Sequence, residues 1–468
     1  MLFKIAFRNI FRNRRRSLMT LLAIAVGAIA IVLFGEFTSF IRVALKTITI
    51  ERVGHLTVFR SGYFDYGGGN PAAFGIDDYQ GVIRLIAEDP EIKPKLNVIT
   101  PTVSLTGIVG NFAINASKTF MGTGFIPSDR NRMLRWDEHH VFRNRVWNVS
   151  GLRDDDETRG IVGVGLARVL GLCEDLGLKN CPPRPQSATP PTAAADEPDS
   201  PEIVALARAE RDTSQAARAE AGPRLDLLAA TASGAPNVMS LFVSGAEPQG
   251  ARELDENFIA LHFSLAQKLL YGRGEHKAVA IVLQLQRTED LAAVRARLGA
   301  ILKEHKLDLE VRDFIERQPF YKQAVDMLDT IFLFISTIMG IIVLFTVVNT
   351  MGMSVMERTN EIGTARALGV RRSGTRRVFV IEGSMLGAFG ATVGVTLGQI
   401  IAVLFNGAGA MWTPPGNAAP TPLRVMTSGV GSLLFGAWLG LVLMATLAAV
   451  IPANRAARLK VVDALRHV

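Results

Sequence analysis

The sequence has few of the residues, and none of the motifs, on which enzymes commonly rely. It contains two cysteines and seven histidines among 468 residues, and neither type is spaced as metal ligands usually are. His139 and His140 follow Asp137 and Glu138, but adjacent side chains point apart in regular structure, which disfavours a metal site there. No Gly-x-Ser-x-Gly turn and no His-Glu-x-x-His helix is present. We therefore expect neither a catalytic residue nor a metal site on this chain.

A nucleotide-binding loop is missing as well. No Gly-x-x-x-x-Gly-Lys-Ser/Thr motif occurs, so the sequence predicts no P-loop ATP hydrolysis and no cofactor on this chain. A net charge of +8 would suggest nucleic acid in a soluble protein. The basic excess lies mostly beside apolar segments, where membrane topology and anionic lipid explain it more simply. Nucleic acid is therefore not an expected partner.

Charged residues are almost absent from four long stretches. These stretches are Leu18–Ile41, Ile331–Met356, Val378–Phe405 and Leu433–Ile451. A helix needs about 20 apolar residues to cross a hydrocarbon core of about 30 Å, and each stretch is near or above that length. The first is too long for a secretory signal peptide and no Ala-x-Ala site follows it, so we interpret it as an uncleaved anchor.

Basic residues flank these stretches mainly on one side of the membrane. They precede the first stretch, fill the loop between the second and third, and follow the fourth: Lys4, Arg8, Arg12, Arg14, Arg15, Arg16, Arg358, Arg366, Arg371, Arg372, Arg376, Arg377, Arg455, Arg458, Lys460 and Arg466. The loop Asn406–Arg424 holds a single basic residue. The positive-inside rule therefore predicts a multi-pass membrane protein with both termini in the cytoplasm and the largest domain outside.

The expected fold is an α-helical membrane protein in which four transmembrane helices carry a large α+β extracytoplasmic domain between helices 1 and 2. The predicted order is an amphipathic helix at 1–16, transmembrane helix 1 at 17–42, the outer domain at 43–325, transmembrane helix 2 at 326–356, a cytoplasmic loop at 357–377, transmembrane helix 3 at 378–405, an outer loop at 406–427, transmembrane helix 4 at 428–451 and a cytoplasmic tail at 452–468. Within the outer domain, the proline- and alanine-rich composition at 174–235 predicts a flexible insert.

Two further features bear on this fold. Cys173 and Cys181 lie eight residues apart in the outer domain; they are either a disulfide, which an oxidising periplasm would permit, or two free thiols. Small residues recur at four-residue spacing in helices 3 and 4, where they let helix backbones approach closely in lipid. We predict that these two helices pack together through Gly383, Gly387, Gly390, Gly394, Gly398, Gly436 and Gly440.

The cytoplasmic loop carries the strongest local pattern. Its segment Glu357–Gly369 predicts a short helix with Ile362, Ala365, Leu368 and Gly369 near one apolar side and charges elsewhere. Such a helix suits insertion into a groove of a partner protein. The alternative is a solvated loop that only satisfies the positive-inside rule. The residues assigned to this candidate site are Glu357, Arg358, Glu361, Ile362, Gly363, Ala365, Leu368 and Gly369.

Several motifs, in a fixed order, resemble the MacB/FtsX/LolC-LolE family of ABC-transporter permeases. They lie at both ends of the chain and in the outer domain: FKIAFRNIFRNRRRS, GIVGVGLARVLGL, FIALHFSLAQKLL, SVMERTNEIGTARALGVRR, VFVIEGSMLGAFGATVGVTLG and IPANRAARLKVVDALRHV. The insert at 174–235 is not explained by the family pattern.

The resemblance implies a non-catalytic type VII permease subunit that works by mechanotransmission. It implies a homo- or heterodimer of permeases with two copies of a separate ATPase subunit, which binds ATP and Mg. The segment Glu357–Gly369 would be the coupling helix. The absence of an ATPase domain here favours the LolC/LolE-like layout over that of MacB.

Three functions follow from the resemblance. The favoured one is release of lipoprotein from the inner membrane to a periplasmic carrier; the second is MacB-like efflux of peptide, macrolide or siderophore through an adaptor protein and an outer-membrane duct. The third is an FtsX-like transducer that activates a cell-wall hydrolase. For a lipid-linked cargo, the predicted contacts are the bulky residues of helices 1 and 2 with one acid near the outer membrane interface: Phe34, Glu36, Phe37, Phe40, Phe332 and Phe334.

Overall fold

The computed structural model describes residues 6–9, 12, 14–141, 151–179, 181, 222–249, 251–272, 274–413 and 421–466. The chain divides into two compact units. The helical unit comprises residues 1–44, 320–412 and 422–468, and the α/β unit comprises residues 45–319 and 413–421. The predicted amphipathic helix at 1–16 lies partly, and the stretch 182–221 wholly, outside the described residues.

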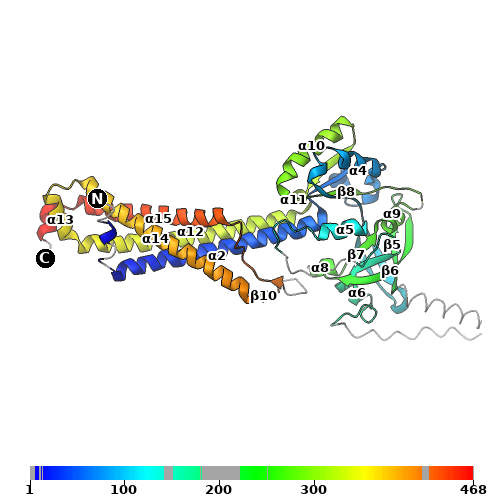
Figure 1. The fold of residues 1–468 in the computed structure, drawn as a ribbon. Coiled ribbons are helices and arrows are strands. Elements are labelled where there is room, and N and C mark those ends of the chain that lie inside the picture. The colour runs from blue at the N-terminus through cyan, green and yellow to red at the C-terminus, as the bar shows by residue number, and fades with distance from the viewer. Residues whose placement is uncertain are drawn as a thin grey trace, which may run out of the picture. The chain divides into compact units, whose positions relative to one another are not determined.

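Long helices dominate the helical unit, and α13 lies at one end of them (Figure 1). Its elements are α2 (Arg14–Val53, of which residues up to 44 belong here), α12 (Pro319–Glu357), α13 (Thr359–Ala367), α14 (Arg372–Ala408), β10 (Met411–Trp412), β11 (Thr421–Pro422), α15 (Gly431–Arg458) and α16 (Val461–Arg466). Within the described residues, α2, α12, α14 and α15 are long and apolar enough to cross a membrane. The four predicted apolar spans are thus confirmed as helices.

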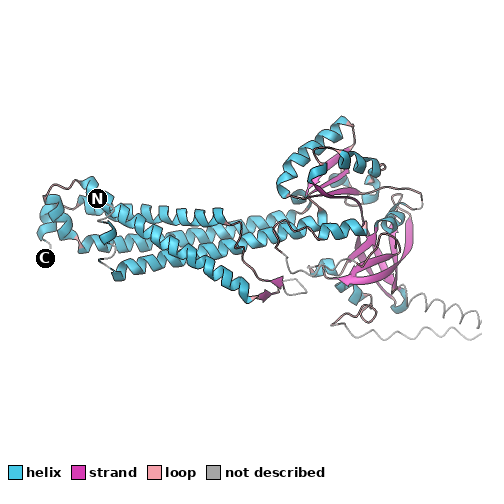
Figure 2. Cartoon of the chain, in the orientation of Figure 1, coloured by secondary structure: helices cyan, strands magenta, loops and turns pink. Residues whose placement is uncertain are grey.

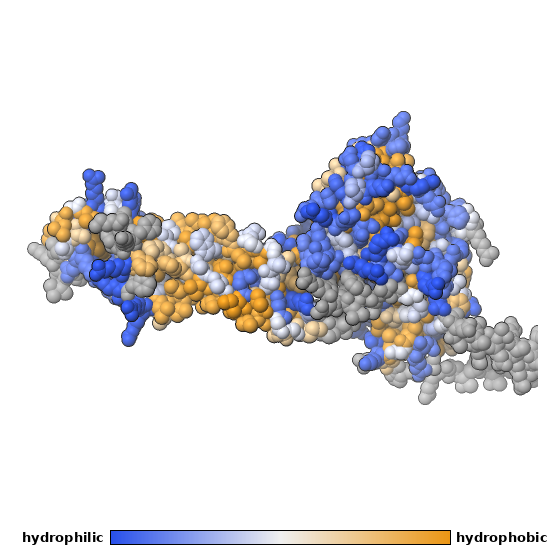
Figure 3. Space-filling model, viewed as in Figure 1, coloured by the Kyte–Doolittle hydropathy of each residue, from blue (hydrophilic) through white to orange (hydrophobic). Residues whose placement is uncertain are grey.

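Apolar side chains cover much of the visible surface of these helices, while hydrophilic side chains gather at the end that carries α13 (Figure 3). Each long helix extends beyond its apolar stretch, because helical hydrogen bonds continue into the polar flanks. The interior is made of small and branched side chains, among them Ile24, Ala28, Val343, Leu386 and Ala445. These residues are at most 2% exposed, which is the close packing expected of a helix bundle.

Helix α14 packs through glycines on two neighbours, where the sequence predicted one. At Gly383 and Gly387 a Cβ atom would collide with Ala449 and Ala445 of α15. At Gly394, however, a Cβ atom would lie 2.5 Å from the Ala25 carbonyl oxygen of α2. Three of the five glycines therefore serve the contact with α2, and the prediction that all of them face α15 was wrong: they are Gly390, Gly394 and Gly398.

The glycines of α15 do not take part in that packing. At Gly436 and Gly440 a Cβ atom would meet no other atom within 4 Å, so the predicted packing role of both residues was wrong. Alanines of α15 allow the close approach to α14 instead: Ala445, Ala448 and Ala449 are at most 1% exposed. Alanine permits nearly as close an approach as glycine, and it forms helices more readily.

Strands and short helices build the α/β unit (Figure 2). The strands are β1 (Leu56–Arg60), β2 (Leu96–Asn111), β3 (Ala116–Phe125), β4 (Arg159–Gly163), β5 (Arg224–Ala230), β6 (Pro236–Glu247), β7 (Phe258–His262), β8 (Ala280–Leu285) and β9 (Leu309–Asp313). The helices are α3 (Tyr63–Tyr66), α4 (Tyr79–Glu88), α5 (Pro127–Leu134), α6 (Val164–Val169), α8 (Arg252–Asp255), α9 (Phe263–Tyr271), α10 (Leu291–Glu304) and α11 (Phe314–Arg317).

One long strand, β2, belongs to both parts of the sheet. Its first half, Leu96–Thr102, pairs with β8, which continues to β1 and then to β9. Its second half pairs with β3 on one edge and β5 on the other. From there the pairing runs from β3 through β7, β4 and β6 back to β5, so six strands close a ring. A closed ring leaves no free strand edge along those pairings.

The boundary predicted for the flexible insert was wrong at its C-terminal end. Residues 224–230 form β5, which pairs with β2 and β6 inside the ring. Leu225 and Leu227 are fully buried there, in the alternating pattern of a strand with one covered face. The sequence did not predict this seven-residue strand, because the proline- and alanine-rich segment before it made the whole stretch resemble a flexible insert.

Candidate docking site at the basic end of the helix bundle

A short helix and two turns connect α12 to α14 at the end of the bundle that carries most of the arginines. Helix α12 ends at Glu357, α13 spans Thr359–Ala367, and α14 begins at Arg372. The Thr359 hydroxyl donates a 2.8 Å hydrogen bond to the Met356 carbonyl. Gly369 follows α13 with φ of 97°, a left-handed conformation that glycine adopts without strain. The connection is therefore a defined turn–helix–turn.

Buried contacts hold α13 against the rest of the helical unit. Ile362 is 7% exposed and belongs to the core of the bundle. Arg358 and Glu382 form a 3.0 Å ion pair in which both side chains are only 5% exposed. Arg366 donates hydrogen bonds to the carbonyls of Ala457 and Leu459, at the end of α15. The short helix α13 is thus attached to α14 and α15 as well as to α12, which precedes it.

The distal end of α13 is apolar and uncovered. Leu368 is 84% exposed and Val370 is 44% exposed. Arg371 and Arg372 follow directly and are also exposed. We call Ala367–Val370 the tip. An apolar tip rimmed by arginines on a rigid helix is the arrangement that a groove with an acidic rim would receive.

The structure separates the predicted site residues into two groups. Ile362 and Gly363 are buried in the bundle, Ala365 is half-buried, and Leu368 and Gly369 are exposed. The prediction that Ile362 shares one apolar side with Leu368 was therefore wrong. The apolar stripe of so short a helix is divided between the chain's own core and the surface, and spacing alone does not mark that division.

Two predicted residues, Glu357 and Glu361, lie in ion pairs with the N-terminal segment. Glu357 pairs with Arg16 at 2.5 Å, and Glu361 pairs with Arg12. Both pairs are substantially exposed, so each contributes about 0–1 kcal/mol to stability. Sequence reasoning missed Arg366 and the pairing of Arg358 with Glu382. The only available signal for the second was an acid inside an apolar stretch, which requires a partner.

The aromatic residues predicted to contact cargo are brought together only in part. Phe34 stacks on Phe332 of α12 with ring centres 6.4 Å apart and lies 6.3 Å from Phe37. Phe40 is half-buried, whereas Phe334 is 65% exposed. Three of the five rings thus form one cluster at the α2–α12 contact.

Glu36 does not lie where the sequence placed it. Its side chain is fully buried and accepts a hydrogen bond from the Gln399 amide of α14. The Glu36 carboxylate therefore faces α14 and not the cluster of phenylalanines, beside which the sequence predicted it.

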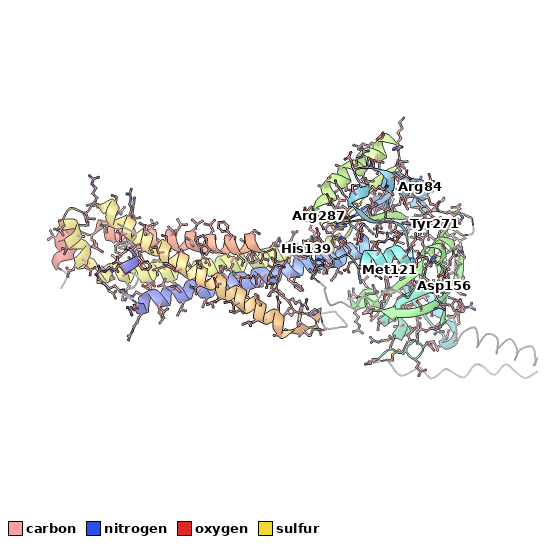
Figure 4. All side chains as sticks on the ribbon, viewed as in Figure 1. Arg84, Met121, His139, Asp156, Tyr271 and Arg287 are labelled. Carbon is pink, nitrogen blue, oxygen red and sulfur yellow. A yellow bond between two sulfur atoms is a disulfide. The ribbon has the colours of Figure 1, made fainter. Side chains whose placement is uncertain are left out.

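Two features considered in the sequence lie in the α/β unit: the cysteine pair and the acidic residue before His139. Cys173 and Cys181 are joined by a disulfide. Glu138, next to His139 (Figure 4), accepts hydrogen bonds from Thr288 and from Lys46. Burial of the carboxylate raises the pKa of Glu138, but the hydrogen bonds from Thr288 and the charge of Lys46 outweigh that effect, so the pKa lies below its usual value.

Comparison with known proteins agrees with this architecture. Residues 333–461 match the family described as FtsX-like permease C-terminal. The chain is 26% identical over 237 residues to an uncharacterized ABC transporter permease of Methanocaldococcus jannaschii, covering 48% of this chain and 54% of that protein. It is 29% identical over 255 residues to the macrolide export ATP-binding/permease protein MacB of Nitrobacter winogradskyi. That alignment covers 50% of this chain and 37% of that protein.

A third relative is the lipoprotein-releasing system transmembrane protein LolC of Neisseria meningitidis, which is 26% identical over 166 residues, covering 36% of this chain and 39% of that protein. The chain thus spans about half or less of the length of these relatives. The match at 333–461 contains most of α12 and all of α13, α14 and α15. These matches support assignment of the chain to the MacB/FtsX/LolC family of ABC-transporter permeases.

Proposed function

We propose that this chain is the transmembrane permease subunit of an ABC transporter and that α13 is its coupling helix. The observation that carries the proposal is the division of α13 into an anchored part and an exposed tip. Because Ile362 and the Arg358–Glu382 pair fix the helix to the bundle, a push on Leu368 would move α12, α14 and α15 rather than bend a loop.

The energy source is a separate ATPase subunit in this proposal. The sequence contains no P-loop motif, so ATP and Mg would be bound by that partner. Two copies of the ATPase and a second permease, identical or related, would complete the assembly. With the positive-inside arrangement, the tip lies in the cytoplasm and the α/β unit in the periplasm of a bacterial inner membrane.

The α/β unit is well attached to the end of α2, which supports transmission of movement along that helix. Arg130 of α5 donates a 2.7 Å hydrogen bond to the Glu51 carbonyl, in the last turn of α2. Arg317 of α11 donates a 3.0 Å hydrogen bond to the Val53 carbonyl. These carbonyls have no partner within the helix. Burial lowers the pKa of both arginines to about 10, so both remain charged at neutral pH.

We propose lipid-linked cargo, released as lipoprotein on the outer side of the membrane, as the substrate. The supporting observation is the cluster of Phe34, Phe37 and Phe332 at the α2–α12 contact, which offers apolar surface of the kind an acyl chain needs. The MacB relatives favour a second candidate, efflux of a peptide, macrolide or siderophore with an adaptor protein and a duct. An FtsX-like transducer of a cell-wall hydrolase is the third.

The tip provides the direct test. Leu368→Asp places a charge on a side chain that is 84% exposed, so the fold of the permease should persist while binding of the ATPase falls at least tenfold. Copurification from native membranes, with mass spectrometry of the bound proteins and lipids, measures both partner and cargo. Phe112→Asp is the matched control, because Phe112 is 78% exposed in the α/β unit. Equal ATPase recovery with both variants would contradict the coupling role of the tip.

A further inference from the structure

A groove of about 930 Å³ lies between the C-terminal half of α12 and the end of α15. Phe345 and Val348 form apolar wall on α12, and Pro452 and Leu459 contribute from α15 and the residue after it. Arg455 also lines the groove. The groove is thus apolar along one part and cationic at another, as an amphipathic ligand requires.

Two polar side chains in the groove lack a protein partner. Asn349 lies inside the apolar stretch of α12, about 12 Å along the helix from its end at Glu357, and is exposed. Arg455 is exposed as well. Neither side chain forms a hydrogen bond or ion pair with the part of the chain that the structure describes. An amide in the hydrocarbon region without a partner is costly, because no water is present there to replace one.

We propose that this groove binds one anionic phospholipid, with its phosphate on Arg455 and a glycerol ester carbonyl accepting a hydrogen bond from the Asn349 amide. The acyl chains lie along Phe345 and Val348. Charge complementarity supports the assignment, since basic pockets between transmembrane helices hold anionic headgroups. The exposed Arg458 nearby adds to the positive potential without lining the groove.

A second copy of the chain is a less suitable occupant. A two-fold interface sets the same surface against itself, so Arg455 of one copy would approach the basic surface of the other. A phosphate satisfies this cation, and an ester carbonyl satisfies Asn349, with no such repulsion. The site is independent of the ATPase, of the cargo and of the orientation of the chain, because it requires only that this end of the bundle meets a membrane interface.

Quenching by brominated lipid tests the proposal on the full-length chain. Phe345→Trp adds a fluorophore in the groove at a side chain that is 67% exposed. The protein is reconstituted in phosphatidylcholine bilayers that contain a fixed fraction of brominated phosphatidylglycerol or brominated phosphatidylcholine. We expect brominated phosphatidylglycerol to quench the added tryptophan preferentially. In the Phe345→Trp protein, Arg455→Gln should reduce the ratio of quenching by brominated phosphatidylglycerol to quenching by brominated phosphatidylcholine about fivefold. Arg458→Gln should leave most of that ratio unchanged.

Phe334→Trp is the matched control, because Phe334 is 65% exposed on the same helix but does not line the groove. Both brominated lipids should quench it equally. Native mass spectrometry gives a second readout: the parent chain should retain bound phosphatidylglycerol, and Asn349→Leu should lose it. Equal quenching of Trp at 345 by both lipids would show ordinary boundary lipid and overturn the proposal. Protection of that tryptophan from both lipids would show that protein, such as a second copy, fills the groove.

Discussion

At the scale of single residues, the buried ion pair between Arg358 and Glu382 decides how α13 is held. The two side chains are 5% exposed, so neither charge has ready access to water. Arg358 also donates a hydrogen bond to the Asn9 carbonyl. Removing one partner from a buried pair leaves an uncompensated charge, which is far more costly than replacing both partners with apolar groups.

We therefore predict that Glu382→Leu destabilises the helical unit by about 3–5 kcal/mol. The double variant with Arg358→Leu should recover a large part of that loss, because no buried charge then remains. Thermal unfolding of the detergent-solubilised chain measures both effects. A double variant that is as unstable as the sum of the two single variants would show that the residues contribute independently.

His55 makes a second residue-scale prediction, in the α/β unit. Burial lowers the pKa of His55 to about 3, and its Nδ1 accepts a 3.0 Å hydrogen bond from the Leu285 backbone amide. The folded state thus holds a neutral ring, whereas the unfolded chain binds a proton below about pH 6.5. Stability should therefore fall as pH decreases from 6.5 towards 3, by about 2 kcal/mol at pH 5.

Thermal unfolding followed by tryptophan fluorescence measures this dependence, since Trp136 lies edge-on to His55 at 4.9 Å. His55→Leu should be less stable at pH 7.5, because a leucine side chain cannot accept the hydrogen bond from the Leu285 amide. Its stability should also change less between pH 7.5 and 5 than that of the parent chain. A variant with the same pH slope as the parent would show that other groups cause the dependence.

At the scale of elements, α14 is the helix on which two others pack. Its glycines meet α15 near one end and α2 further along. Gly394→Leu would drive a side chain into the Ala25 backbone, which lies 2.5 Å from the position of its Cβ atom. We predict a loss of at least 1–3 kcal/mol in the stability of the bundle. Gly436→Leu is the matched control, since its Cβ atom would meet open space.

Crosslinking between cysteines placed on α2 and α14, combined with thermal unfolding, measures this effect. Gly394→Leu should reduce both the crosslinking yield and the midpoint of unfolding, while Gly436→Leu should change neither. If both variants behave alike, the close approach of α2 and α14 is not required for stability.

The sequence predicted the long helices better than it predicted which of them pack against each other. The four apolar stretches predicted four long helices, because length and hydrophobicity suffice for that inference. They did not identify which helix each glycine meets, since small-residue spacing reports a close approach but not its partner. Likewise Glu36 was recognised as an acid near a membrane interface, but its burial against Gln399 depends on the rotation of α2, which the spacing of polar residues left open. Strand β5 was missed because a short strand beside a long biased segment has little periodicity of its own.

At the scale of the whole molecule, the proposed transporter requires that movement of α2 reaches the α/β unit. Arg130 and Arg317 cap the last turn of α2 with charge-assisted hydrogen bonds. We predict that Arg130→Gln with Arg317→Gln loosens this attachment while the docking tip remains intact. ATPase binding should therefore persist, and release of cargo should fall at least tenfold.

Reconstituted permease and ATPase, assayed for both hydrolysis and cargo release, separate the two effects. A variant at the tip, Leu368→Asp, should lose both activities because the ATPase no longer binds. Should the arginine variant release cargo at the parental rate, these caps would serve only the stability of the α/β unit.

The pairing of β1 with β9 has a consequence for how such proteins diversify. These two strands are antiparallel neighbours, with Leu56 opposite Asp313 and Arg60 opposite Leu309. The chain that follows α2 and the chain that precedes α12 therefore run side by side, about 5 Å apart. Everything between them is a cassette with adjacent ends, which can be exchanged, enlarged or shortened without changing the spacing of the two helices it joins. The cassette can thus change in size and surface independently of the bundle, and hybrids of this bundle with the corresponding cassette of another permease would test that independence.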